Sequence, residues 1–169
     1  MSQRLHHGAA RAFTIIEVLV VAIIIAIMAA SATNLFTSGR YERLQAAVQL
    51  VRSDMDWARS ASLSSPTDPI ILKIRNDGSG YFLAKASAPT TALTGANGPL
   101  SLTFGTGRGE CAEGVTLGVV SGVGTVQFGP FGGVADPVPT LRFTLSDGDE
   151  QARMLLDPFT GDPTIIYEN

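Results

Sequence analysis

Hydrophobic residues follow three different patterns along this chain. Residues 12–32 (AFTIIEVLVVAIIIAIMAASA) are apolar almost without interruption, residues 40–63 carry apolar residues at helical spacing, and residues from 70 onward form short apolar runs between turns. An apolar run of about 20 residues has the length that crosses a bilayer as a helix. The patterns therefore predict a membrane-spanning helix, an amphipathic helix and a β-rich domain, in this order.

The second segment has the period of an amphipathic helix. Its apolar residues recur at spacings of three and four: Leu44, Val48, Val51, Met55 and Ala58. Charged residues lie between them: Arg43, Arg52, Asp54 and Arg59. Between Phe13 and Pro66 the chain contains no proline and only one glycine, Gly39, so we expect one helix from about residue 13 to residue 63. Its first half is apolar on all sides, and its second half has one face with which to cover a globular domain.

The remaining chain is predicted to be a β-domain. We expect strands at residues 70–74, 81–84, 100–104, 115–120, 125–128, 140–145, 152–156 and 164–167, and a loop at residues 87–99. The turn at residues 76–80 joins the first two strands as a hairpin. The predicted fold class is therefore α+β: a long N-terminal α-helix, with a membrane half and an amphipathic half, packed on a C-terminal antiparallel β-sheet domain.

The segment before the apolar run has the basic character of a leader or of a cytoplasmic flank. Residues 1–12 contain Arg4 and Arg11 and no acidic residue. Positive charge beside an apolar run keeps that side of the membrane in the cytoplasm, so the C-terminal domain is expected outside it. An ordinary secretory signal is an open alternative, because the sequence Ala-Ser-Ala that ends at Ala32 fits the rule for its cleavage site.

Glu17 is the one charged residue in the apolar run. A carboxylate at the centre of a membrane helix costs roughly 2.5–3.5 kcal/mol on insertion scales, and less near an end. Its presence therefore indicates a role and a partner. The alternative is a carboxylate at the membrane interface that headgroups and water simply solvate.

Residues 12–17, Ala-Phe-Thr-Ile-Ile-Glu, resemble the cleavage and methylation motif of type IV prepilins and type II secretion pseudopilins. In that family a small residue precedes Phe, a short apolar stretch follows, and Glu stands fifth in the mature chain. The resemblance implies that a prepilin peptidase cuts between Ala12 and Phe13 and methylates the new amine of Phe13. The chain departs from the family at Ala12, where glycine is usual.

The amine that such a cleavage creates needs an anion. It is a cation at the membrane end of a helix, where an unpaired charge is expensive. Glu17 of the same chain lies about one helical turn away, and Glu17 of a neighbouring subunit is the alternative partner. The resemblance implies the second arrangement, in which Glu17 pairs with Phe13 of a neighbour and fixes the axial register of a filament.

The C-terminal half adds to the resemblance. Residues 126–133 (VQFGPFGG), residues 141–148 (LRFTLSDG) and the pair Thr160 and Gly161 are similar to the globular domain of the H-type minor pseudopilins and their pilus-system relatives. The implied organisation is a leader (residues 1–12), a transmembrane and polymerisation helix (13–32), an amphipathic helix (33–65) and a periplasmic or extracellular β-rich domain (66–169).

The resemblance implies a structural subunit of a type II secretion pseudopilus in the inner membrane, with one span and its C-terminal domain in the periplasm. Its expected partners are other pilin or pseudopilin subunits, the prepilin peptidase and methyltransferase, and the inner-membrane assembly platform. One alternative is a minor pilin of a type IV pilus that serves adhesion, motility or DNA uptake. Another is a membrane-anchored or secreted β-domain that binds a ligand without polymerising.

Charge and residue types bear on these alternatives. The formal net charge is −3, and residues 115–169 contain only Arg142 and Arg153 against seven acidic residues, so we do not expect nucleic-acid binding. His6 and His7 both precede the predicted cleavage site, and the single Cys111 has no histidine partner in the mature chain. We therefore expect no catalytic site, and thus no enzyme.

A calcium site is the remaining candidate for ligand chemistry. Asp147, Asp149 and Glu150 supply three carboxylates within four residues. Calcium prefers six to eight oxygen ligands, and the spacing matches no standard calcium loop. Since an Asp-Gly turn between strands needs no metal, we expect a solvated hairpin turn here, and no metal or other cofactor.

Overall fold

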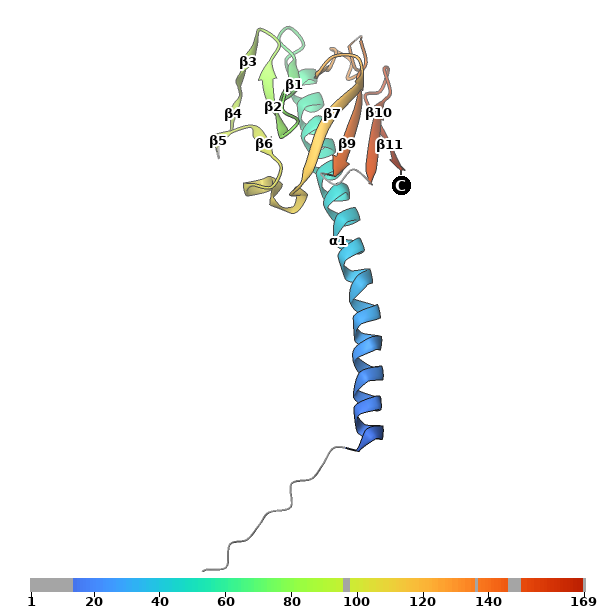
Figure 1. Cartoon of the computed structure of the whole chain (residues 1–169). Helices are drawn as coiled ribbons and strands as arrows, with labels where there is room; N and C mark the ends of the chain where they lie inside the picture. Colours follow the sequence, from blue (N-terminus) through green and yellow to red (C-terminus); the bar gives the residue numbers. More distant parts are fainter. Residues whose placement is uncertain (1–13, 96–97, 136, 146–149, 169) are drawn as a thin grey trace, which may run out of the picture. The chain divides into compact units, whose positions relative to one another are not determined.

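The computed structural model describes residues 14–95, 98–135, 137–145 and 150–168, except the side chains of residues 29–38. The chain divides into two units, Met1–Ser38 and Gly39–Asn169, which are described separately. The helix α1 (Ile15–Ser64) contributes to both (Figure 1). Its bounds agree with the single helix that the sequence predicts.

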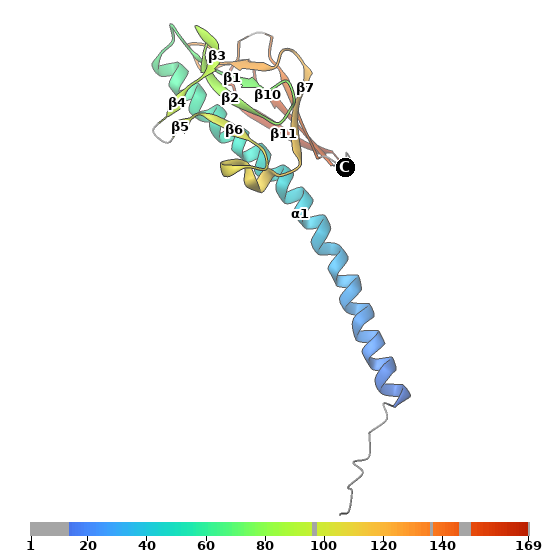
Figure 2. The ribbon, with the colours of Figure 1, turned by 60° about the vertical axis from the view of Figure 1, so that its left-hand side comes forward.

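Two antiparallel sheets make up most of the second unit (Figures 1 and 2). The first has the strand order β3-β2-β1-β8, with β6 also paired to β2, and consists of β1 (Ile70–Ile74), β2 (Gly80–Lys85), β3 (Ala88–Ala92), β6 (Ser101–Thr103) and β8 (Thr125–Gln127). The second has the order β11-β10-β9-β7 and consists of β7 (Val115–Ser121), β9 (Thr140–Leu145), β10 (Gln151–Leu156) and β11 (Pro163–Glu168). The short strands β4 (Thr94–Gly95) and β5 (Gly98–Pro99) pair with each other, and a 3-10 helix, η1 (Gly107–Ala112), follows β6.

The C-terminal part of α1 runs along the sheets and shares their core (Figures 1 and 2). The apolar stripe read from the sequence is fully buried, with exposed fractions of at most 2%: Leu44, Val48, Val51, Met55 and Ala58. Each of the two sheets contributes equally buried residues, such as Leu72 of β1 and Phe143 of β9. Burying one such side chain contributes roughly 1.5–3 kcal/mol, so this shared core holds α1 against both sheets.

Ser62 connects the end of α1 to the first strand, β1, by a hydrogen bond. Its side chain is completely buried, and its Oγ donates to the Ala58 carbonyl at 2.8 Å while accepting from the Ile70 N–H at 2.9 Å. Both hydrogen bonds satisfy groups that would otherwise be buried without partners. The helix then ends at Ser64, two residues before Pro66, as the proline predicts.

The α+β fold class is confirmed: a long N-terminal helix packs on antiparallel sheets in a pilin-like arrangement. The loop predicted at residues 87–99 was wrong, because this segment contains β3, β4 and β5. Four of the five side chains of β3 are exposed, so no apolar alternation marks this strand in the sequence. Its pairing comes from the neighbouring strand β2, across an irregularity in register between Ala84 and Lys85.

Asp54 was expected among the exposed charged residues of the amphipathic helix, but it is only 8% exposed. Its Oδ2 accepts a hydrogen bond from the Tyr81 hydroxyl of β2 at 2.7 Å and forms a salt bridge with Arg108 of η1. The Tyr81 hydroxyl also reaches the Leu50 carbonyl at 3.3 Å. This polar cluster of Asp54, Tyr81 and Arg108 ties a strand and η1 to α1.

The polar cluster predicts a specific dependence of stability on pH. Burial raises the pKa of Tyr81 above its ordinary value of 10.0, and the Asp54 carboxylate raises it further. Above about pH 10 the unfolded chain loses this phenolic proton while the folded chain keeps it, so this contribution to stability is complete below pH 10 and is lost as the pH rises. We expect Tyr81→Phe to decline less steeply than wild type between about pH 9 and about pH 11, measured by urea unfolding. Parallel declines of the two proteins would contradict this account.

Candidate functional site

The N-terminal turn of α1 contains the one predicted assembly residue that the structure describes, Glu17. Its backbone N–H donates to the Thr14 carbonyl at 3.0 Å and lies 3.4 Å from Thr14 Oγ1. The Val18 N–H also reaches the Thr14 carbonyl, at 3.2 Å. Thr14 therefore caps the helix, because it accepts from the Glu17 N–H, one of the donors of the first turn that the helix itself leaves unpaired.

Sequence reasoning missed Thr14, although a signal for it was present. A threonine followed three residues later by glutamate, as in Thr14 and Glu17, is the capping-box pattern that marks the start of a helix. An acidic side chain in the first turn also faces the positive end of the helix dipole. Glu17 thus has a local structural role to be weighed against the predicted role in assembly.

The apolar side chains that follow Glu17 are exposed in the described part of this unit. Every large hydrophobic residue between positions 15 and 28 is exposed, from 48% at Val20 and Val21 to 88% at Ile15. Ala22 and Ala26, which complete the segment with Glu17, are exposed as well. Apolar surface on all sides of a helix is stable only in lipid or against other apolar helices. This part of α1 therefore needs a nonaqueous surrounding.

Membrane crossing is a separate question. In the part of the chain that the structure describes, no helix is long and apolar enough to span a membrane. The predicted span, residues 13–32, reaches beyond that part, since Phe13 and the side chains of residues 29–32 lie outside it. The span stays a prediction.

The other predicted site residues are mostly outside the described residues. Ala12 and Phe13, at the expected cleavage site, lie there, and so do Asp147 and Asp149 of the calcium alternative. Glu150 is described and half-buried, and its carbonyl accepts from the Leu145 N–H at 3.3 Å. Among the residues with a defined placement, no group of three or more His, Cys, Asp or Glu side chains is arranged to hold a metal ion.

Comparisons with known protein families, with curated proteins and with solved structures find no match to this chain. Function is therefore inferred from the chain's own residues. Three features carry that inference: the capped turn that holds Glu17, the uncovered apolar surface of residues 15–28, and the pilin-like packing of the second unit.

Proposed function

We propose that this protein is a minor pseudopilin, a non-enzymatic filament subunit of a type II secretion pseudopilus. The observation that carries the proposal is the apolar surface that residues 15–28 expose on every side of α1, interrupted only by Glu17. A plain anchor needs such a surface but no charge within it, whereas a polymerising helix has a use for both. The α+β unit then supplies the part of the subunit that stands outside the bundle.

The steps before assembly follow from the sequence motif. The basic leader holds the N-terminus in the cytoplasm, and the second unit lies in the periplasm. Prepilin peptidase removes residues 1–12 and methylates the Phe13 amine. The processed chain then passes from the inner membrane into the filament through the assembly platform.

Glu17 supplies the register of the filament. Its side chain is exposed, and the capping hydrogen bonds at Thr14 use its backbone N–H, so its carboxylate is available to a neighbouring chain. Inside a bundle of apolar helices an unpaired charge costs several kcal/mol. The carboxylate and the Phe13 amine of a neighbour meet at one axial offset only, so this pairing selects that offset among the many that apolar surfaces tolerate.

The N-terminal residue of the mature protein tests the proposal. We expect protein purified from the membranes of its native host to begin at N-methylated Phe13, as read by mass spectrometry of its N-terminal peptide. Ala12→Gly, which installs the usual residue of the family, should be processed at least as completely. A chain that begins at Thr33 would identify a secretory signal, and an uncleaved chain would identify a plain anchor; either result would overturn the proposal.

A further inference from the structure

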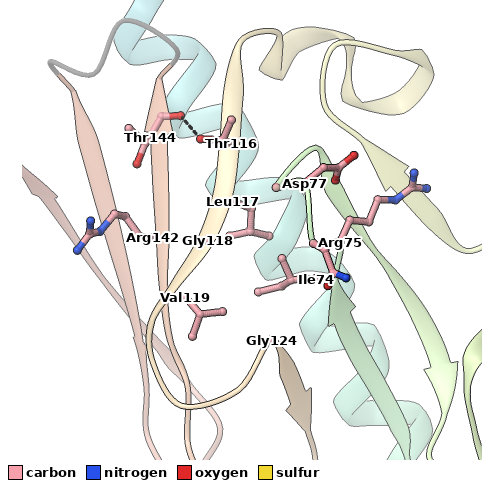
Figure 3. A pocket seen from close by; sticks show the side chains of 12 residues that line it. Ile74, Arg75, Asp77, Thr116, Leu117, Gly118, Val119, Gly124, Arg142 and Thr144 are labelled. Carbon is pink, nitrogen blue, oxygen red and sulfur yellow. Dashed lines mark hydrogen bonds between the residues drawn. The ribbon is translucent and has the colours of Figure 1, made fainter.

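A crevice of about 500 Å³ opens in the second unit between the β1–β2 turn and strand β7 (Figure 3). Two of the three glycines in its lining have open space around them, Gly118 on β7 and Gly124 before β8. A Cβ atom placed on either glycine meets no atom within 4 Å. The crevice therefore exposes backbone to an incoming chain, with Arg75 and Asp77 on the side of the turn and Arg142 and Thr144 on the side of β9.

Strand β7 presents to this crevice an edge that is occupied at Leu117 and open at Val119. Only one of its edges is paired within the second sheet, with β9. The Leu117 N–H points away from β9 and toward the β1–β2 turn, where it donates to the Gly78 carbonyl at 2.9 Å. Backbone groups of alternate residues in a strand point to the same side, so those of Val119 face the crevice as well. Within the described residues, no backbone hydrogen bond reaches Val119 from that side.

The charges around the crevice favour an acidic occupant. Neither Arg75 nor Arg142 forms a salt bridge with any described residue. The Asp77 carboxylate is engaged within its own turn, where Oδ1 accepts from the Ser79 N–H at 3.0 Å and from Ser79 Oγ at 2.8 Å. Two arginines and one aspartate give the lining a formal charge of +1, in a chain whose formal charge is −3. Opposite charge directs an acidic partner to this place.

We propose that this crevice binds an extended, acidic segment of a partner protein, which pairs as a strand with β7 at Val119. Main-chain hydrogen bonds to an exposed sheet edge supply affinity in this mode, and side-chain contacts supply selectivity. The selective contacts are carboxylates of the partner with Arg142, which lies directly opposite Gly118 in the register of β7 and β9, and with Arg75. Both side chains extend away from the opening in Figure 3, so each turns toward the partner to make its contact. The inference concerns the second unit and does not depend on polymerisation through residues 13–32.

A synthetic strand tests the binding mode. The probe is a fluorescein-labelled peptide of alternating valine and glutamate, titrated with the full-length protein in mild detergent and followed by fluorescence anisotropy. We expect saturable binding that is at least about tenfold tighter than that of the matched peptide with lysine in place of glutamate. The same acidic peptide with methylated backbone nitrogens cannot donate to a strand edge, so it should also bind at least about tenfold more weakly.

Two variants locate the site. Gly118 has no positive φ and has open space around it, so Gly118→Val fills the crevice without strain. This variant should weaken the binding of the acidic peptide by about tenfold or more. Arg142→Glu should weaken it comparably. The matched control is Arg52→Glu, on an exposed position of α1 outside the crevice, which changes the net charge equally and should alter binding by less than about twofold. Thermal unfolding of each variant confirms that its fold is intact.

Several results would overturn the proposal. Equal affinity for the acidic and basic peptides would remove the charge argument, and unchanged binding by Gly118→Val would place the peptide elsewhere. Tight binding of the methylated peptide would exclude pairing with β7. A single-stranded oligonucleotide that binds in place of the peptide, and loses affinity with Gly118→Val, would show that the crevice takes nucleic acid instead.

Discussion

We expect Glu17→Gln to abolish incorporation of the protein into filaments while its insertion in the membrane is unchanged. The substitution removes the charge but keeps an amide that glutamine can use in a capping box, so the start of α1 is preserved. In the filament that we propose, it leaves the Phe13 amine of a neighbouring subunit without its anion inside an apolar bundle. Breaking such a buried pair costs about 3–5 kcal/mol, which is a loss of more than about a hundredfold in the assembly equilibrium.

The measurement is the fraction of the protein in sheared or pelleted filaments against the fraction in the inner membrane, detected by immunoblot in the native host. Secretion of the host's type II substrates is read from the same cultures and should fall with incorporation if the subunit belongs to that system. Unchanged secretion together with lost surface pili would assign the protein to a type IV pilus.

Thr14→Ala separates the place of Glu17 at the start of α1 from the role in register that we propose for it. It removes the Oγ1 that caps α1 and leaves the charge of Glu17 in place. Loss of a cap costs about 1 kcal/mol, so this control should reduce incorporation only modestly. If Thr14→Ala were as damaging as Glu17→Gln, or if Glu17→Gln assembled normally, the carboxylate would serve the helix start and the register role would be wrong.

The sequence predicted those elements whose side chains obey one clear period. Strand β9 is an example: Leu141, Phe143 and Leu145 are buried in alternation, and its bounds were predicted residue for residue. The buried stripe of α1 is another. Strands β3, β4 and β5 gave no such signal, because they are short or exposed and their pairing depends on neighbouring strands. The free energy of such pairing depends on which strands lie beside each other in the fold, and the intrinsic strand propensity of the residues does not predict this.

The candidate sites divide in the same way. Glu17 stands out in the sequence because a charge within an apolar run is costly in a membrane. The crevice could not be predicted, because Arg75 lies in the β1–β2 turn and Arg142 in β9, and only the fold brings them to one opening. Asp54 misled the sequence reading for a related reason. At its position a charge is typical of a solvated helix face, and only the placement of Tyr81 and Arg108 makes its burial tolerable.

We expect Asp54→Ala to destabilise the second unit by about 2–3 kcal/mol, the effect of losing a buried hydrogen bond to a charged group together with some packing. The carboxylate side chain is only 12% exposed, and its removal deprives the Tyr81 hydroxyl of the acceptor at 2.7 Å. The Arg108 side chain is 55% exposed, so solvent screens its salt bridge and its share of the loss is small. Chemical unfolding followed by circular dichroism measures the change in free energy.

Two further variants decide whether the hydrogen bond between Tyr81 and Asp54 carries this stability. Arg108→Ala should cost less than about 1 kcal/mol. Asp54 keeps its hydrogen bond from the Tyr81 hydroxyl in this variant, and the Arg108 charge that is removed was largely exposed to solvent. The double variant of Asp54→Ala with Tyr81→Phe should lose less than the sum of the two single losses, since each single change breaks the same hydrogen bond. Strict additivity of the two changes, or a loss at Arg108→Ala as large as at Asp54→Ala, would assign the stability to the ion pair with η1 and refute the role given to Tyr81.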